Sequence, residues 1–241
     1  RLLQNPDYQP RIRLQQALEE LIALSEDMLE RVANVETVKE RVELNENSYY
    51  CNAPHKSGGD ALTTYAVLYD NNYETFLHTD YSGADSEDKL DHYLRVDLGE
   101  DNSASLFTFN YASRSNGNQN PSAITIEGCN TEDGEYELIT KLTRDADKLI
   151  SGGNSEYHSA VMGLSSKSYR YLRFMVTGTI QGSTKGPNDD PETPDVNEEN
   201  KHVFFVFSEF GVSKATCNVT ALPKYSTLTN DDVAKAFNAI R

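Results

Sequence analysis

Residues 107–111 read Phe-Thr-Phe-Asn-Tyr, so a large apolar side chain occupies every second position and a polar one lies between. Successive side chains of a strand point to opposite faces, and this alternation is typical of a strand with one buried and one exposed face. The same period-two pattern recurs at residues 94–98, 124–127 and 172–176. Turn-forming Gly, Asn, Ser and Asp separate these runs, without a long helical pattern between them. The sequence therefore predicts a mainly β domain of antiparallel strands, a sandwich or jelly roll, and disfavours a parallel βαβ sheet.

One run departs from the alternation. Residues 202–212 are apolar on both faces, with Phe204 and Val206 on one side and Phe205 and Phe207 on the other. A central strand whose outer face is covered would explain this pattern. The amino-terminal segment of the chain is one candidate for that cover.

Residues 1–48 are expected to form a helical segment, because apolar side chains recur there at steps of three and four. This series comprises Leu14, Leu18, Leu21, Met28, Val32 and Val35. A spacer or docking helix explains it, and so does a helix that binds a partner or oligomerises. The β-sandwich is expected to cover residues 49–216. Residues 217–241 are expected to be a linker followed by a short carboxy-terminal helix, since Val233, Phe237 and Ile240 again have helical spacing.

The charge of the chain restricts its partners. Its 241 residues include 22 Lys and Arg but 38 Asp and Glu, a formal net charge of −16. Such a surface repels phosphate backbones and anionic lipids, so we expect no nucleic-acid partner. An apolar run of about 18 residues, as a membrane-spanning helix requires, is missing, so we expect no membrane insertion.

Motifs for catalysis or zinc binding are also missing from the sequence. It contains no GxSxG, HExxH, GxGxxG or Walker-type motif, and its five His residues are scattered. The three Cys residues form no CxxC pair. Cys129 is expected to be a small buried hydrophobic residue, and a disulfide between Cys51 and Cys217 stays open. We expect no catalytic residues in this chain, which leaves room for an enzymatic domain elsewhere in a longer parent protein.

A series of short motifs follows in a recognisable order between residues 49 and 215. It consists of Asn52-Ala53-Pro54, the run from Leu68 to Tyr81, Leu94 to Gly99, Phe109 to Arg114, Pro121 to Asn130, Tyr169 to Phe174, and Phe207-Ser208-Glu209-Phe210. This order resembles the discoidin superfamily, also called coagulation factor V/VIII type C domains, which includes the family 32 carbohydrate-binding modules. The resemblance covers about 165 of the 241 residues and is closest to secreted or surface proteins of Bacteroidetes.

The resemblance implies an eight-stranded antiparallel jelly-roll sandwich of the galactose-binding type, with a non-catalytic role outside the cell or on its surface. Its loops would bind a carbohydrate or glycan. Two alternatives remain open. The sandwich could be a structural or protein–protein interaction (adhesion) module without a glycan ligand, or an accessory domain of a larger glycoside hydrolase.

The resemblance also implies a structural cation, usually Ca²⁺. By analogy, its ligands would be the carbonyls of Leu68, Asn72 and Thr75 and the carboxylates of Asp70 and Glu209. These are hard oxygen donors, as Ca²⁺ prefers. An unpaired carboxylate would also be costly in the apolar strand that contains Glu209. As alternatives to binding a cation, Asp70 could be an ordinary turn residue and Glu209 a residue at the rim of the sandwich. Asn71 and Asn72 depart from the usual loop sequence, but Asn tolerates a left-handed turn.

Galactose-binding members of this superfamily hold the sugar with a His, an Arg, an Asn and an aromatic residue. The residues here that correspond approximately, or are of the right kind on adjacent loops, are His78, Tyr81, Arg114, Asn118 and Asn120. Tyr81 is a substitute for the aromatic platform, because the chain contains no Trp. The alternatives are a His78 satisfied by the backbone, an Arg114 paired with an acid such as Asp80, and a Tyr81 used for packing.

Overall fold

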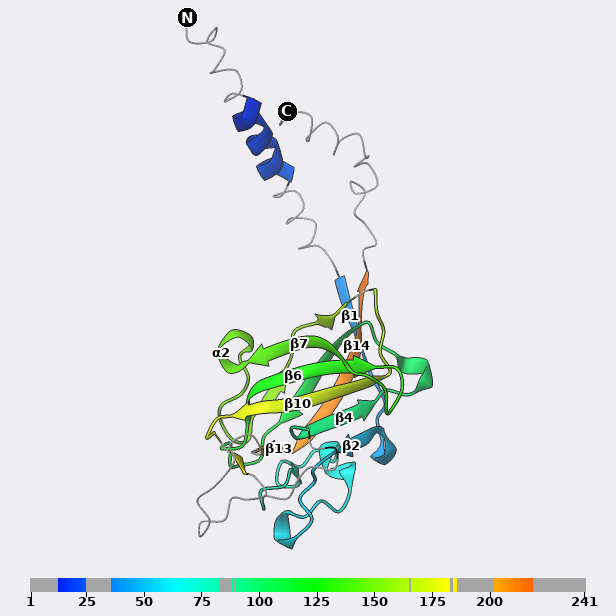
Figure 1. Cartoon of the computed structure of the whole chain (residues 1–241), viewed down its shortest axis with the longest axis vertical. Helices are drawn as coiled ribbons and strands as arrows, with labels where there is room; N and C mark the ends of the chain where they lie inside the picture. The colour runs from blue at the N-terminus through cyan, green and yellow to red at the C-terminus, as the bar shows by residue number, and fades with distance from the viewer. Residues whose placement is uncertain are drawn as a thin grey trace, which may run out of the picture. The chain divides into compact units, whose positions relative to one another are not determined.

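The computed structural model describes residues 13–24, 36–82, 88, 90–164, 166–182, 184–185 and 202–218 (Figure 1). The chain divides into two units, one formed by Arg1–Val38 with Thr216–Arg241 and the other by Lys39–Ala215. In the first unit the structure describes a helix at residues 13–24, where Leu14, Leu18 and Leu21 are about half exposed. None of the described helices is both long and apolar enough to cross a membrane.

The expected helical segment 1–48 is wrong at its carboxy-terminal end. A strand, β1 (Glu36–Arg41), and a short helix, η2 (Glu46–Ser48), lie within it. The sequence Glu-Thr-Val-Lys-Glu-Arg contains good helix formers, but β1 is placed beside β14 at the edge of a sheet. Pairing with a neighbouring strand overrides a local preference of this size. Met28, Val32 and Val35 and the expected carboxy-terminal helix lie outside the described residues.

The second unit contains two five-stranded sheets. The first has the order β1-β14-β5-β8, with β9 also pairing with β5, and the second the order β2-β4-β10-β6-β7. Among the described residues there are also two two-stranded pairs, β11-β12 and β3-β13. The remaining strand bounds are β2 (Tyr49–Cys51), β3 (Leu77–His78), β4 (Tyr93–Asp97), β5 (Leu106–Ala112), β6 (Pro121–Cys129), β7 (Glu137–Thr143), β8 (Glu156–His158), β9 (Met162–Gly163), β10 (Tyr171–Thr179), β11 (Thr184–Lys185), β12 (His202–Val203), β13 (Val206–Phe207) and β14 (Glu209–Asn218).

Short helices occupy several of the connections between strands. They are η3 (Gly58–Asp60), η4 (Tyr65–Leu68), η5 (Glu100–Asn102) and α2 (Arg144–Asp147). The expectation of a mainly β, antiparallel sandwich is confirmed, and Figure 1 shows β6 and β10 crossing in front of β14.

The alternation read from the sequence matches the sheet register. On β10, Phe174 lies opposite Leu94 of β4 and Ile126 of β6, and its side chain is fully buried. The next residue toward the amino terminus, Arg173, faces the other side of the sheet and forms an ion pair with Glu127 at 2.6 Å. The apolar face therefore points to the core and the polar face carries charge pairs.

Aromatic rings from both sheets meet in the core. Phe109 of β5 and Phe210 of β14 approach Phe174 of β10 with ring centroids 4.9 and 4.8 Å apart. All three side chains are 2% exposed or less. Rings at these separations interact by edge and offset contacts in addition to the area that they bury.

The expected single strand at residues 202–212 is wrong. The structure divides it into β12, β13 and the start of β14. Val206 pairs with His78 of β3, whereas the Ser208 N–H donates to the Ala112 carbonyl of β5 at 2.9 Å. The chain thus changes its pairing partner at Ser208. Residues 202–212 are apolar on both faces because the residues before Ser208 and those after it pack against different neighbours.

The expected burial of Cys129 is confirmed, whereas the disulfide between Cys51 and Cys217 is not tested by the structure. The side chain of Cys129 is buried, as expected, and so is that of Cys51. The side chain of Cys217 lies outside the part of the chain that the structure describes, so its pairing with Cys51 stays a prediction.

Candidate functional site

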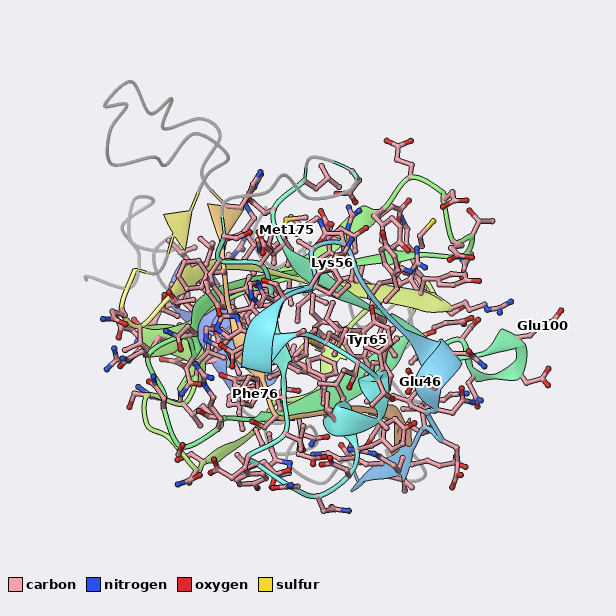
Figure 2. All side chains as sticks on the ribbon, turned by 90° about the horizontal axis from the view of Figure 1, so that it is seen from below. Glu46, Lys56, Tyr65, Phe76, Glu100 and Met175 are labelled. Atoms are coloured by element: carbon pink, nitrogen blue, oxygen red, sulfur yellow. The ribbon has the colours of Figure 1, made fainter. Side chains whose placement is uncertain are left out.

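Two loops at one end of the sandwich bring together three residues of the predicted sugar site. His78 ends β3, and Tyr81 follows three residues later with its ring edge-on to His78 at 4.7 Å. Arg114 lies two residues after β5, and its guanidinium covers the ring of Phe76 at 4.5 Å. Phe76 in turn lies 6.4 Å from His78. Figure 2 looks toward the end of the molecule that carries these loops and labels Phe76.

His78 is a buried side chain with one ring nitrogen engaged. Its Nδ1 lies 2.7 Å from the carbonyl oxygen of Thr79. A carbonyl only accepts hydrogen bonds, so Nδ1 carries a proton, and in the neutral ring Nε2 is then an acceptor. Burial lowers the pKa of His78, and the positive charge of Arg114 lowers it further. The backbone contact matches the alternative named for this residue, but it leaves the second nitrogen available.

Among the described residues, the side chain of Arg114 forms a hydrogen bond with Gln119. Its Nη2 donates to Oε1 of Gln119 at 3.1 Å. Its Nε is buried and has no hydrogen-bond partner among the described residues. Asp80, the acid considered as its partner, instead accepts from Nδ1 of His55 at 2.9 Å. Gln119 and the face of Phe76 therefore hold the guanidinium plane, and several of its N–H groups are left for other acceptors.

Tyr81 is fixed at the surface. Its hydroxyl donates to Oδ2 of Asp60 at 3.0 Å, and its ring stacks on His55 at 4.0 Å. The residue is 37% exposed. Phe204, which the sequence analysis did not include in the site, lies 6.1 Å from Tyr81 and 6.0 Å from His78. The extra apolar face of residues 202–212 was the signal that could have identified it.

The two predicted asparagines have different positions. Asn120 is buried, and its Nδ2 donates to the carbonyl of Gly152 at 2.9 Å, so it connects two loops. Asn118 is exposed, and its backbone contacts Asn116 and Gln181. Neither of these hydrogen-bond sets includes His78, Tyr81 or Arg114. The aromatic, imidazole and guanidinium groups thus come together, whereas Asn120 supports the loop from within.

The predicted cation loop lies against Glu209. The Asn72 N–H donates both to Oδ1 of Asp70 at 2.9 Å and to Oε1 of Glu209 at 3.2 Å. Thr75 donates its hydroxyl to Oδ2 of Asp70 at 2.6 Å and to the Asn72 carbonyl at 2.8 Å. Asn71 has the left-handed φ of 60° that the sequence allowed. The loop residues and the glutamate from β14 are therefore neighbours, although 137 positions separate Asn72 from Glu209.

The carboxylates of Asp70 in the loop and Glu209 of β14 repel each other. Burial raises the pKa of Glu209, and the negative charge of Asp70 raises it further. A hard cation beside them would remove this repulsion, and the carbonyls and the Thr75 hydroxyl would add neutral oxygen donors. Within the described residues no three His, Cys, Asp or Glu side chains form a metal-binding group. The oxygen donors of the loop and of Glu209 are of the hard type that suits Ca²⁺ better than a transition metal. Leu68 is fully buried, and only its backbone carbonyl could take part.

Comparison with known proteins gives matches at the level of structure. No family model and no curated protein matches the sequence. Among solved structures, a family 32 carbohydrate-binding module from Clostridium perfringens, in complex with GalNAc-β-1,3-galactose, is 14% identical. It has a TM-score of 0.44 and covers 68% of this chain and 92% of its own.

Two further structures are similar. The family 32 module of NanJ from the same organism, in complex with galactose, is 16% identical with a TM-score of 0.45, over 73% of this chain and 100% of its own. An F5/8 type C domain from Bacteroides fragilis is 11% identical with a TM-score of 0.44, over 73% of this chain and 96% of its own.

Proposed function

We propose that the sandwich is a non-catalytic carbohydrate-binding module, and that it captures a sugar at the surface formed by His78, Arg114, Tyr81 and Phe204. One observation carries this proposal. The imidazole of the buried His78, with Nε2 as an acceptor, and a guanidinium donor lie beside two aromatic rings at the loop end of the sandwich. Sugar recognition requires this combination, because hydroxyls both donate and accept while the C–H face of the ring is apolar.

Each group has a distinct part in the proposed capture. Nε2 of His78 accepts a hydrogen bond from one hydroxyl, and the free N–H groups of Arg114 donate to another sugar oxygen. Tyr81 or Phe204 covers the apolar face of the ring. The contact area is small, so the affinity of a single module is low. Attached to a surface or to other domains of a parent protein, it still raises the local concentration of a glycan. We assign the protein to the cell surface or the extracellular space on the same basis.

Replacing His78 by alanine is expected to weaken galactose binding roughly 2- to 12-fold, since a hydrogen bond between neutral groups contributes about 0.5–1.5 kcal/mol. Galactose is a suitable probe because it has one apolar face and a cluster of hydroxyls. NMR titration of the intact chain measures the dissociation constant. Lys141→Ala, an exposed change on β7, is the matched control. If the intact chain bound neither galactose nor any sugar on a glycan array, the interaction-module alternative would replace this proposal.

We further propose that the loop from Asp70 to Thr75 binds a structural Ca²⁺ together with Glu209. The support is the shared Asn72 N–H and the raised pKa of Glu209, which indicate two carboxylates in need of a counter-charge. The bound ion would neutralise both and hold the loop against β14. Asp70 and Glu209 would supply carboxylates, Leu68, Asn72 and Thr75 carbonyls.

Removing Ca²⁺ by chelation is expected to lower the melting temperature. Ca²⁺ at 100 times its dissociation constant stabilises the native state by about 2.7 kcal/mol. Thermal melts with EDTA and with added Ca²⁺ measure the difference, and Glu209→Gln should abolish it. Glu135→Gln, an exposed change of the same kind, should retain it. Equal melting temperatures in both buffers, with no metal by elemental analysis, would exclude the ion.

A further inference from the structure

A polar groove crosses the outer face of the sheet β1-β14-β5-β8. Its volume is about 370 Å³, within the range of small-ligand sites. Along β5 the residues Thr108 and Asn110 line it, whereas Phe107 and Tyr111 are fully buried on the core side. Lys39 and Arg41 of β1, Glu156 and His158 of β8, and Glu209 and Ser213 of β14 also line it. Asn71, Tyr73, Phe109 and Ser159 complete the lining. None of them belongs to the sugar surface at His78.

The two acids of the groove already have partners. Glu156 accepts from Nδ2 of Asn110 at 3.1 Å and lies 3.4 Å from Nε2 of His158. Glu209 accepts from the backbone N–H of Asn72. Each carboxylate therefore accepts from a donor of the protein itself, and the Ca²⁺ proposed above would offset the charge of Glu209.

The two basic residues of the groove, Lys39 and Arg41, differ from the acids in their contacts. Arg41 donates from Nη1 to Oδ1 of Asn110. Its guanidinium also lies directly over Gly211 of β14, where any Cβ would clash with it. None of the described carboxylates forms an ion pair with Arg41 or Lys39. Asn110 and the side-chain-free surface at Gly211 thus orient the Arg41 guanidinium, which has no acidic partner among the described residues. Its remaining N–H donors face the groove.

We propose that this groove binds a carboxylate-bearing sugar, with the Arg41 guanidinium holding the carboxylate. A planar guanidinium pairs with a carboxylate through two parallel hydrogen bonds, which an ammonium cannot reproduce. Lys39, on the same face of β1 two residues earlier, adds a second positive charge. The hydroxyl, amide and carboxylate groups along β5, β8 and β14 supply partners for the sugar hydroxyls. The formal charges of the four charged side chains in the groove, Lys39, Arg41, Glu156 and Glu209, sum to zero, whereas the whole chain has a net charge of −16. The groove is thus far less repulsive to an anion than the chain as a whole.

Galacturonate and galactose test this proposal as a pair, because they differ only in the carboxylate at C6. NMR or calorimetric titration of the intact chain should show galacturonate binding at least tenfold more tightly than galactose at this groove, with shifts at the amides of Arg41 and Asn110. Arg41→Gln should reduce galacturonate affinity roughly tenfold or more. Arg41→Lys, which keeps the charge but not the planar fork, should give an intermediate loss. Raising the salt concentration should weaken galacturonate binding and leave galactose binding unchanged.

Two controls separate this groove from the surface at His78. Arg144→Gln removes an exposed arginine on α2 and should leave galacturonate affinity within twofold. His78→Ala should also leave galacturonate affinity unchanged, whereas that variant binds galactose more weakly. Thermal melting checks that Arg41→Gln is folded, and Lys39→Gln replaces it if it is not. Equal binding of the two sugars by the wild-type chain, or a folded Arg41 variant within twofold of wild type, would overturn the inference.

Discussion

Replacing Phe210 by alanine is expected to reduce the free energy of unfolding by about 3–5 kcal/mol, the usual range for a fully buried phenylalanine. The Phe210 side chain is fully buried where the two sheets meet. Its ring lies 4.8 Å from Phe174 of the opposite sheet and 5.1 Å from Phe207 beside it. Alanine would leave a cavity between the sheets that the surrounding strands cannot close, because their backbones are held by hydrogen bonds to other strands.

Urea unfolding followed by circular dichroism measures this loss. Destabilisation by this amount corresponds to a decrease in melting temperature of roughly 10 °C for a domain of this size. Leu138→Ala on β7 is the control, because that side chain is 55% exposed and its removal should change the stability by less than about 0.5 kcal/mol. A Phe210 variant as stable as this control would show that the ring does not join the sheets as described.

Acidification from pH 6.5 to pH 4 is expected to destabilise the protein by about 3 kcal/mol through His92 alone. This side chain is 1% exposed, and neither of its ring nitrogens has a hydrogen-bond partner among the described residues. Burial is the main reason that its pKa falls from 6.5 to about 4. The charge of His202, whose ring stacks on it at 5.5 Å, lowers the pKa further, while Asp80, Asp91 and Asp88 act in the opposite direction.

The sign follows from which state binds the proton. Between pH 6.5 and 4 the unfolded chain protonates this histidine while the folded chain does not, so the proton stabilises the unfolded state. The contribution of His92 is fully present above pH 6.5 and is lost as the pH falls toward 4. His78, whose pKa is also lowered, adds a loss of the same sign. Glu209, whose pKa is raised, opposes it.

Urea unfolding at a series of pH values between 7 and 4 measures this dependence. His92→Leu replaces the ring by an apolar side chain that needs no partner, and its stability should vary less with pH over this interval. His158→Leu removes a histidine whose side chain is 70% exposed and should leave the wild-type slope. Identical slopes for wild type and His92→Leu would show that another group causes the acid sensitivity.

The position of the candidate sugar surface explains why few of its contacts could be inferred in advance. His78 and Arg114 were predicted because a His and an Arg occur, approximately, at the corresponding places in the series of motifs that resembles the superfamily. Phe204 was missed because residues 202–212 were interpreted as one continuous strand, in which an apolar residue needs no functional explanation. Asn120 was predicted as a ligand residue, but its donor is turned inward to Gly152. The direction of a loop side chain depends on contacts with distant residues, and local sequence does not contain them.

The edge strand β1 shows the same limit in the fold. Its residues favour a helix by propensity, and only the neighbouring β14 makes them extended. The groove on that sheet depends on the same pairing, since it sets Arg41 over Gly211 and beside Asn110. No spacing in the sequence relates these three positions.

The period-two alternation determined by itself that this chain forms an antiparallel β-sandwich, because burying one face of each strand leaves a single arrangement of apolar and polar residues. The Asp-Asn-Asn turn likewise determined its own left-handed conformation at Asn71. Only the tertiary structure decided which loops meet. It placed Glu209 against Asn72 and Phe204 against His78, since such contacts join segments more than a hundred residues apart and depend on how the strands pair.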